Sequence, residues 1–162
     1  MDSGGGDLRR LIQSFIRLNG LLAGDQTPCG HPLAVSHAHA LMVLLEAARG
    51  GKRLTQRELG QVLGIDKSNV ARLCRRMETA GHVVQSRLAD DGRARLSSLT
   101  TLGTRVAKDV ERSSRDRFRQ LTSAIPPGSR AKVLSSLTCL NRALMSLDTP
   151  KRTRAARRRQ AD

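Results

Sequence analysis

The sequence predicts a mainly helical protein with one small β-hairpin, and three observations lead to this prediction. The chain has no Trp or Tyr and only two Phe among its 162 residues, so Leu, Val and Ala must build the core, which suits helices better than a β-sandwich. Near both ends, apolar residues recur three and four positions apart, as they do in amphipathic helices. In the middle, two short helical segments precede a stretch whose turn contains Asp-Asp-Gly, the signal of a hairpin.

The first third of the chain predicts two helices joined by a loop. Residues 7–22 carry one apolar stripe made of Leu8, Leu11, Phe15, Leu18 and Leu22. Residues 23–33 hold two Gly and two Pro and read as a loop. We expect the second helix to begin after Ser36 as its N-cap and to end before Gly50-Gly51.

The central stretch predicts a helix-turn-helix followed by a two-stranded wing. Thr55, with Glu58 three residues later, forms a capping box for a short helix. Asp66 is the expected N-cap of the next helix, which Gly81 ends. Strands are expected at 83–89 and 93–99, closed by the Asp-Asp-Gly turn. A helix-turn-helix with such a wing is a shape that binds duplex DNA.

The last third predicts two long helices. The first starts at Thr100 or Thr101 and stops before Pro126-Pro127-Gly128, and Ser129 is the expected cap of the second, which is striped with Leu. A lone helix cannot bury such a stripe, so we expect the terminal helices to pair with each other and with a second subunit; packing within one chain is the alternative. The predicted fold is therefore mainly α with a small β-wing: a winged helix-turn-helix flanked by N- and C-terminal dimerisation helices.

Four segments follow from this pattern. We expect an N-terminal dimerisation helix and a loop containing Cys and His (1–35), a DNA-binding domain (36–100), C-terminal dimerisation helices (101–149) and a disordered basic tail (150–162). The chain has 29 Lys and Arg against 14 Asp and Glu, a net charge of +15. Polyanions are the natural partners of such a surface, nucleic acid before anionic membrane. Without a long apolar run, no membrane span is expected.

The second helix of the central unit has one apolar and one polar face. Val70, Leu73, Cys74 and Met77 share the first, which should anchor the helix. On the second, Arg can bind guanine bidentately and Asn can bind adenine; the alternative is a merely solvated basic face. With the basic wing tip, which can reach a minor groove, the expected DNA contacts are Lys67, Ser68, Asn69, Arg72, Arg75, Arg76, Arg93 and Arg95.

The run LTQRELGQVLGIDKSNVARLCRRMETAGHVVQ, followed by DDGRARLSSLTTLG, resembles the winged-helix core of the MarR family of bacterial transcriptional regulators. The resemblance covers roughly residues 36 to 105. It implies an obligate dimer made by the terminal helices, a near-palindromic operator and, in many members, a ligand or oxidant that changes the spacing of the recognition helices. The family's DNA contacts would fall on Ser68, Asn69, Arg72 and Arg93. Two positions depart from the pattern: Gly92 stands where Arg is frequent, and His82 where an aliphatic residue is usual.

A sensor is a further hypothesis. Cys29, His31, His37 and His39 are ligand types that bind zinc, although on one helix His37 and His39 would point about 200° apart. Cys29 is also a candidate for thiol redox sensing, and the remaining alternative is that the cluster senses nothing. Members of the family often bind aromatic anions, for which the candidate basic lining is Arg17, His37, His39 and Arg105. Three separated cysteines without a CxxC pattern indicate reduced thiols in the cytoplasm.

The sequence contains no Ser/His/Asp set, paired carboxylates or phosphate-binding Gly loop that would indicate an enzyme. The expected function is a sequence-specific transcriptional regulator, a repressor, that acts as a homodimer on double-stranded DNA in the bacterial cytoplasm, at the nucleoid. It requires no cofactor and is released by a small molecule, a metal such as zinc, or an oxidant. Two alternatives stay open: a non-specific nucleoid-type DNA-binding protein, and a metal- or redox-responsive cytosolic protein.

Overall fold

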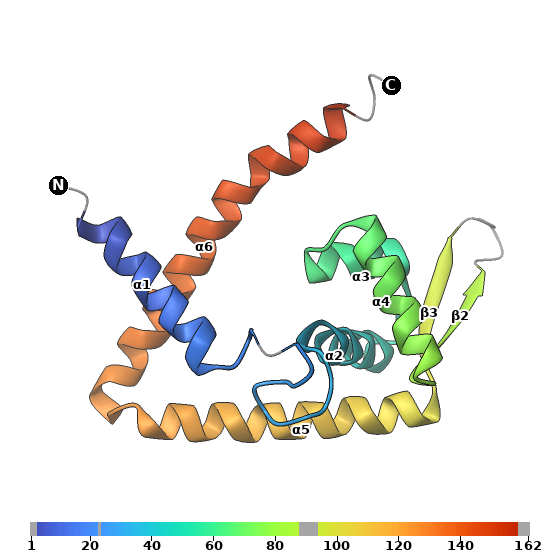
Figure 1. The fold of residues 1–162 in the computed structure, drawn as a ribbon, viewed down its shortest axis with the longest axis horizontal. Coiled ribbons are helices and arrows are strands. Elements are labelled where there is room, and N and C mark those ends of the chain that lie inside the picture. The colour runs from blue at the N-terminus through green and yellow to red at the C-terminus, as the bar shows by residue number, and fades with distance from the viewer. Residues whose placement is uncertain (1–2, 23, 88–93, 159–162) are drawn as a thin grey trace. The chain divides into compact units, whose positions relative to one another are not determined.

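The structure is a computed structural model that describes residues 3–22, 24–87 and 94–158. The chain forms two compact units, Met1–Arg117 and Phe118–Asp162, and the division falls inside helix α5 (Figure 1). Most of the described chain is helical, with a small sheet in the first unit. In chain order the elements are α1 (Ser3–Leu18), α2 (Val35–Arg49), β1 (Leu54–Thr55), α3 (Gln56–Leu63), α4 (Lys67–Thr79), β2 (Val83–Arg87), β3 (Arg95–Leu99), α5 (Thr101–Ala124) and α6 (Pro127–Arg158).

The sheet has three antiparallel strands in the order β1-β3-β2. The wing strands β2 and β3 confirm the predicted hairpin and pair Val83 with Leu99 and Arg87 with Arg95. Strand β1, which the sequence does not predict, pairs Leu54 with Ser97 on the other edge of β3. The wing is thereby joined to the residues that start α3. The predicted Asp91-Gly92 turn lies outside the described residues.

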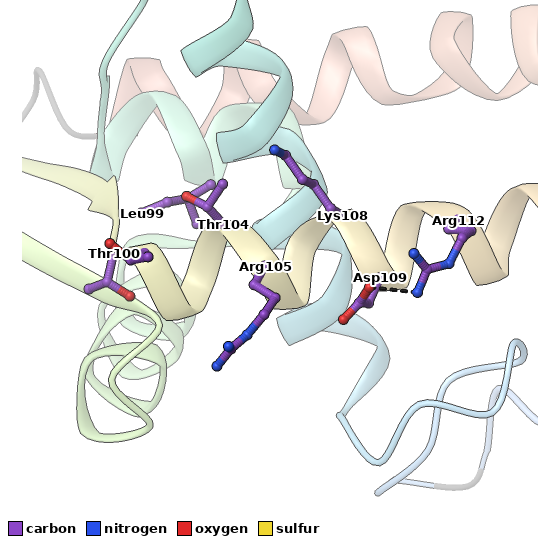
Figure 2. A pocket seen from close by; sticks show the side chains of 8 residues that line it. Leu99, Thr100, Thr104, Arg105, Lys108, Asp109 and Arg112 are labelled. Atoms are coloured by element: carbon purple, nitrogen blue, oxygen red, sulfur yellow. Dashed lines mark hydrogen bonds and ion pairs between the residues drawn. The ribbon is translucent and has the colours of Figure 1, made fainter.

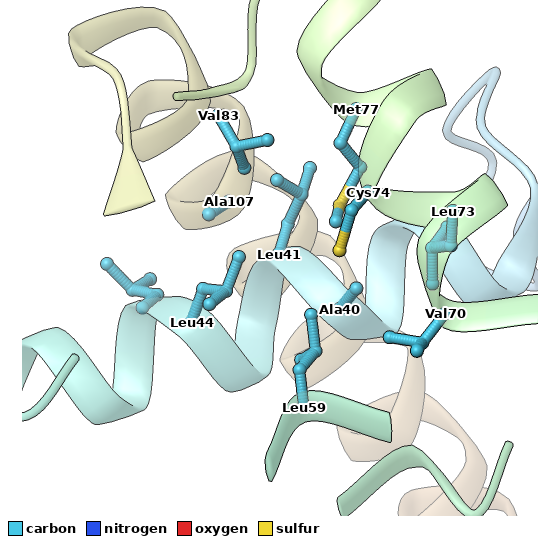
Figure 3. Close-up of a cluster of buried hydrophobic side chains, with 11 residues drawn as sticks. Ala40, Leu41, Leu44, Leu59, Val70, Leu73, Cys74, Met77, Val83 and Ala107 are labelled. Carbon is cyan, nitrogen blue, oxygen red and sulfur yellow. The ribbon is translucent and has the colours of Figure 1, made fainter. Parts of the chain in front are cut away.

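The core of the first unit forms where α2, α3, α4, β2 and α5 meet. In Figure 3, Leu41 of α2 points between Met77 and Cys74 of α4 and Val83 of β2. All four side chains are at most 1 % exposed. Burial raises the pKa of the Cys74 thiol, which keeps it protonated. Cys74 is therefore a core side chain, and the predicted anchoring face of α4 is confirmed.

Several helix ends differ from the predicted ones. Helix α2 begins at Val35, and Ala34 stands at its N-cap with no side-chain hydrogen bond; Ser36 lies inside the helix, so its prediction as the cap is wrong. Helix α6 begins at Pro127, because the fixed φ of Pro suits the first helical position, and Ser129 is not its cap. The α6 backbone also stays helical to Arg158, where the sequence predicts disorder; Ala and Arg are strong helix formers.

The predicted apolar stripes stay exposed in the single chain. On α1, Leu11 is 69 % and Leu18 73 % exposed. On α6, Leu134 is 62 % and Leu147 68 % exposed. Large apolar side chains that stay exposed along two helices are typical of an interaction site.

None of the helices in the described segments has the length and apolar character needed to cross a membrane.

Candidate nucleic-acid interface

Two capped helices in close contact form the helix-turn-helix. The capping box predicted for α3 is present: Glu58 N donates to Thr55 Oγ1 (3.2 Å) and Thr55 N donates to Glu58 Oε2 (2.8 Å). Gly64 ends α3 with φ +67°, in the left-handed region that favours glycine. Gly60 lies at the contact with α4, where an added Cβ would come within 3.3 Å of the Val70 side chain. The absence of a side chain at Gly60 therefore allows the two helices to pack closely.

Helix α4 presents its polar face to solvent. Val70, Leu73, Cys74 and Met77 are buried. The opposite side carries the predicted DNA contacts, all of them exposed: Lys67, Ser68, Asn69, Arg72, Arg75 and Arg76. A helix held by one apolar face and basic on the other has the form of a recognition helix for the major groove.

Hydrogen bonds link the side chains at the start of α4. The Asp66 carboxylate accepts from the backbone N–H of Ser68 (2.8 Å) and of Asn69 (2.9 Å), which confirms Asp66 as the N-cap. Asn69 Nδ2 donates to Asp66 Oδ2 (2.6 Å), and Arg72 Nη2 donates to Asn69 Oδ1 (2.8 Å). The hydrogen bond from the Asn69 backbone contributes most to lowering the pKa of Asp66. Asp66 therefore stays a carboxylate and connects through Asn69 to Arg72.

The wing adds basic side chains beside the helix. Arg95 begins β3 and is exposed, opposite Arg87 in the pairing register. Arg93, the other predicted wing contact, lies outside the described residues. Sequence reasoning missed Arg53, whose guanidinium donates to Ser86 on β2 and to Ser98 on β3 at 3.3 Å each. The sequence gives no signal for this contact, because Arg53 directly precedes strand β1, which has only two residues.

A polar contact also ties the wing to both helices of the helix-turn-helix. Gln85 of β2 donates through Nε2 to Glu78 Oε2 of α4 (2.7 Å). Its Oε1 accepts from Gln56 at the start of α3. The wing, α3 and α4 are thus held together as one surface.

The base of the wing is fixed against the start of α5. Thr100 N donates to His82 O (3.0 Å), Thr100 Oγ1 donates to Gly81 O (2.7 Å) and Gly103 N donates to Thr100 Oγ1 (2.9 Å). Gly103 is buried directly against the His82 backbone. The wing and α5 therefore meet through backbone groups, with no room for a side chain at Gly103.

A buried pair of histidines connects α2 to the base of the wing. His37 Nε2 and His82 Nδ1 are 2.9 Å apart in a hydrogen bond. The pKa of His37 is lowered to about 4, mainly by burial and further by the nearby His82 and Arg76. Burial also lowers the pKa of His82, so both imidazoles are neutral near pH 7. The unusual His82 thus has a packing partner. His37 is consequently not directed toward Cys29.

The predicted metal cluster does not form. Cys29 Sγ contacts Thr27 Oγ1 (3.1 Å), His31 Nε2 contacts Ser113 Oγ of α5 (3.1 Å), and His39 is exposed on α2. Among the residues that the structure describes, no three His, Cys, Asp or Glu side chains are grouped to hold a metal ion. The four candidates are close in sequence, but His37 points into the core against His82 and His31 points to α5.

A shallow hollow lies along the first turns of α5 (Figure 2). Its volume is about 590 Å³, and it is lined by Leu99, Thr100, Thr101, Thr104, Arg105, Lys108, Asp109 and Arg112. Arg112 donates to Asp109 (2.7 Å), while Arg105 and Lys108 point away from that pair in the figure. Of the four residues predicted to line a ligand site, Arg105 lines this hollow. Arg17 lies on α1, His37 is buried against His82, and His39 is exposed.

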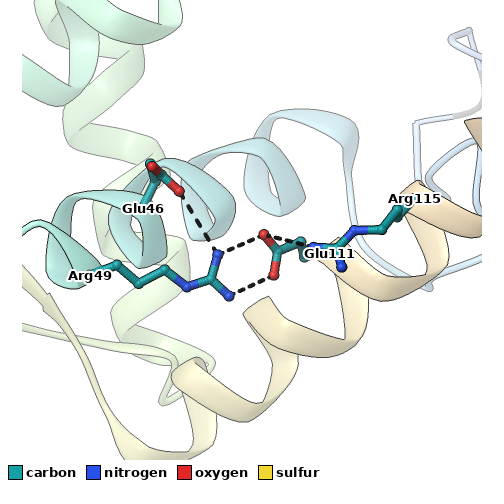
Figure 4. A network of polar contacts seen from close by, with 4 residues as sticks. All are labelled: Glu46, Arg49, Glu111 and Arg115. Carbon is teal, nitrogen blue, oxygen red and sulfur yellow. Dashed lines mark hydrogen bonds and ion pairs between the residues drawn. The ribbon is translucent and has the colours of Figure 1, made fainter.

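An ion-pair network joins α2 to α5 (Figure 4). Both terminal nitrogens of Arg49 donate to the two carboxylate oxygens of Glu111 at 2.7 Å. Arg115 lies 3.6 Å from Glu111, and Glu46 lies 3.8 Å from Arg49. The hydrogen bond from Arg49 is the main cause of the lowered pKa of Glu111. A bidentate pair fixes orientation as well as distance, so it holds α5 against α2.

Comparison with known proteins finds the same architecture. Residues 31–94 match the model of the MarR family. The structure is similar to a probable transcriptional regulator from Pseudomonas aeruginosa, with 24% identity, coverage of 86% of this chain and 97% of that one, and a TM-score of 0.65. It is also similar to the S. aureus MepR–DNA complex, with 19% identity, coverage of 88% and 99%, and a TM-score of 0.67.

A third similar structure is the PcaV transcriptional regulator from Streptomyces coelicolor in complex with its natural ligand. The identity is 22%, the coverage is 88% of this chain and 94% of that one, and the TM-score is 0.61. Among curated proteins, none matches the sequence significantly. At these identities the structural matches establish a shared fold along nearly the whole length of each neighbour.

Proposed function

We propose that this chain, whose residues 31–94 match the model of the MarR family of transcriptional regulators, is a repressor that binds a near-palindromic operator as a homodimer. The observation that carries the proposal is the exposed basic face of α4, set on a helix-turn-helix whose apolar side is fully buried. The matching family and the structural neighbours are transcriptional regulators, not enzymes. It acts on double-stranded DNA in the bacterial cytoplasm.

The residues of the interface are assigned different roles. Arg72 and Arg75 project from the middle of α4 and suit bidentate binding to guanine. Lys67 and Ser68 lie at the helix start, where charge and backbone N–H groups favour phosphate contacts. Arg76 flanks this face and adds positive charge. The wing arginines, Arg93 and Arg95, reach the backbone or an adjacent minor groove.

A second copy of the chain covers the apolar stripes of α1 and α6. In a monomer the leucines of both helices stay exposed to water. Burying them against a second copy would stabilise the dimer by about 25 cal/mol for each Å² of apolar surface. We assign these contacts to segments 1–35 and 101–149, and the DNA contacts to 36–100.

The basic segment 150–162 adds non-specific attraction to the phosphates. A two-fold dimer then sets half-sites about one helical turn apart. The MepR structure, solved as a DNA complex, supports this mode of binding.

A small anionic effector is the second part of the proposal. The hollow on α5 is lined by Arg105 and Lys108, which have no ion pair among the described residues, together with threonine hydroxyls. PcaV, whose structure contains its natural ligand, supports a small-molecule signal. We expect benzoate, used as a probe, to bind in calorimetry and Arg105→Gln to abolish the heat. Equal binding by Arg105→Gln would place the site elsewhere.

Cys29 stays a candidate for an oxidant signal. Its thiol is half-buried beside the Thr27 hydroxyl. Mass measurement after peroxide treatment, with Cys29→Ser as the control, tests this role. A zinc signal receives no support from the geometry, because His31 and His37 are engaged elsewhere.

Repeated selection of bound duplexes from random DNA tests the main proposal. We expect enrichment of one inverted repeat. Arg72→Ala should fail to enrich it. Lys132→Ala, which removes the same charge from an exposed position on α6, should enrich the same repeat as the unmodified chain. Failure of the unmodified chain to enrich any sequence, with binding that depends on salt alone, would instead indicate a nucleoid-type protein.

A further inference from the structure

The amide of Asn69 is engaged at both ends. Its Nδ2 donates to Asp66 Oδ2 at 2.6 Å, and its Oδ1 accepts from Arg72 Nη2 at 2.8 Å. Bidentate recognition of adenine by Asn requires the same two groups at the same time. Each group keeps a second site, one N–H on Nδ2 and one lone pair on Oδ1, but the two hydrogen bonds already fix the orientation of the amide. Asn69 is therefore engaged within the helix before any base approaches it.

Asp66 holds the other end of this series of hydrogen bonds in place. Its Oδ1 accepts from two backbone N–H groups of the first helical turn, at 2.8 and 2.9 Å, which leaves Oδ2 directed at Asn69. The carboxylate is thus fixed by the helix itself. The carboxylate in turn fixes the side chain of Asn69. Asn69 then fixes the guanidinium of Arg72.

Arg72 uses one terminal nitrogen for Asn69, and Asn69 is its one hydrogen-bond partner among the described residues. A guanidinium carries five N–H groups, so donors remain on the side that faces solvent. An arginine side chain otherwise loses much rotamer freedom on binding, and holding it in one orientation beforehand reduces that loss.

We propose that Asp66 and Asn69 are positioning residues that orient Arg72 for guanine, and that Asn69 does not itself read a base. This proposal rests on the proposed function, since it assigns roles within the same DNA-binding face. It differs from the expectation that Asn69 contacts adenine, and it adds Asp66, an acidic residue, to the residues proposed to determine specificity.

A double-mutant cycle on the chain of 162 residues separates this role from a direct contact. Affinity is measured for the operator obtained by selection and for a scrambled duplex, using the unmodified chain, Asn69→Ala, Arg72→Ala and the double variant. Because a hydrogen bond to a charged group is lost, Asn69→Ala should weaken operator binding about tenfold and leave scrambled binding nearly unchanged. In the Arg72→Ala background the same substitution should change operator binding less than about twofold. Combined with Arg75→Ala, as a matched control on the same face, the tenfold loss should persist.

Asp66→Asn tests the first step separately. Asn is as good an N-cap as Asp, so the thermal midpoint should stay unchanged. The Nδ2 of the introduced Asn, however, cannot accept the hydrogen bond that Asn69 donates to Asp66 Oδ2. Operator affinity should fall severalfold with scrambled affinity unchanged. Full operator affinity in Asp66→Asn would show that Asp66 is only a cap and would overturn its role.

The outcomes also separate this proposal from the proposed function. A tenfold loss for Asn69→Ala that persists in the Arg72→Ala background would mean that Asn69 contacts DNA itself, and would overturn the positioning role while leaving the regulator intact. Unchanged operator affinity of Asn69→Ala would also overturn the positioning role. Equal affinity of the unmodified chain for operator and scrambled duplex would overturn the proposed function and the positioning role together.

Discussion

The contact between Gly103 and the wing leads to a quantitative prediction about stability. A Cβ added at Gly103 would lie 1.8 Å from the His82 carbonyl oxygen and 2.7 Å from its carbon. Both atoms belong to the backbone, so no side-chain rotation relieves the overlap, and the start of α5 must move by about 1 Å or more in a close-packed region. The movement also strains the hydrogen bond from Thr100 N to His82 O (3.0 Å).

Gly103→Ala should therefore destabilise the first unit. Overpacking costs about 1–3 kcal/mol, and the upper end applies because the clash is with backbone. Replacing a helical glycine by alanine itself stabilises the helix by about 1 kcal/mol. The net loss in the free energy of unfolding is therefore about 2 kcal/mol. For a chain of this length that corresponds to a fall in the thermal midpoint of about 4–8 °C.

Urea unfolding followed by circular dichroism measures the loss, with Gly50→Ala as the matched control. Gly50 has φ −82°, and an added Cβ there would meet its nearest atom at 3.5 Å, an ordinary contact. Gly50→Ala should be neutral or stabilising by up to about 1 kcal/mol. Unchanged stability of Gly103→Ala would refute the close contact between α5 and the wing.

Three further predictions concern the histidine pair, the ion-pair network and the basic tail. The pKa of His37 is about 4 in the folded chain, below its ordinary 6.5, so the unfolded chain binds the extra proton between these values. Stability should thus fall by about 3 kcal/mol as pH drops from 6.5 to 4; in urea unfolding at several pH values, His37→Gln should flatten this slope, and an equal slope in the variant would contradict the assignment. Glu111→Gln breaks the bidentate pair with Arg49 and should slightly lower the thermal midpoint, by an amount that shrinks in high salt; a loss independent of salt would contradict an electrostatic role. Deletion of 151–162, which holds six Lys and Arg, should weaken operator and scrambled duplex by the same factor and reduce the salt dependence of both. A loss confined to the operator would contradict a non-specific role.

Features that depend on a few neighbouring residues were predicted from the sequence. The capping box of Thr55 and Glu58 and the cap by Asp66 are local, and the structure confirms both. Ser36 looked similar but has His39 three residues on, so it lacks the Glu or Gln that completes a capping box. The helix begins before it, with the first hydrogen bond from His37 N to Ala34 O.

Features that join distant segments could not be predicted in this way. His37 and His82 are 45 positions apart and meet only after α2 packs under the wing. Strand β1 has two residues, too few for an alternating pattern, and without it the contact of Arg53 with both wing strands has no signal. The polar face of α4 follows from helical periodicity. The engagement of Asn69 by Asp66 and Arg72 does not, because it depends on rotamers.

The most direct test of the central claim, sequence-specific readout by α4, is the affinity of the unmodified chain and of Arg72→Ala for operator and scrambled duplex at one salt concentration. We expect the unmodified chain to prefer the operator by at least about a thousandfold. Arg72→Ala should lose about ten- to a hundredfold of that preference, as expected for one guanine contact, while its affinity for scrambled duplex stays nearly unchanged. An equal loss on both duplexes, or no preference by the unmodified chain, would contradict readout through Arg72.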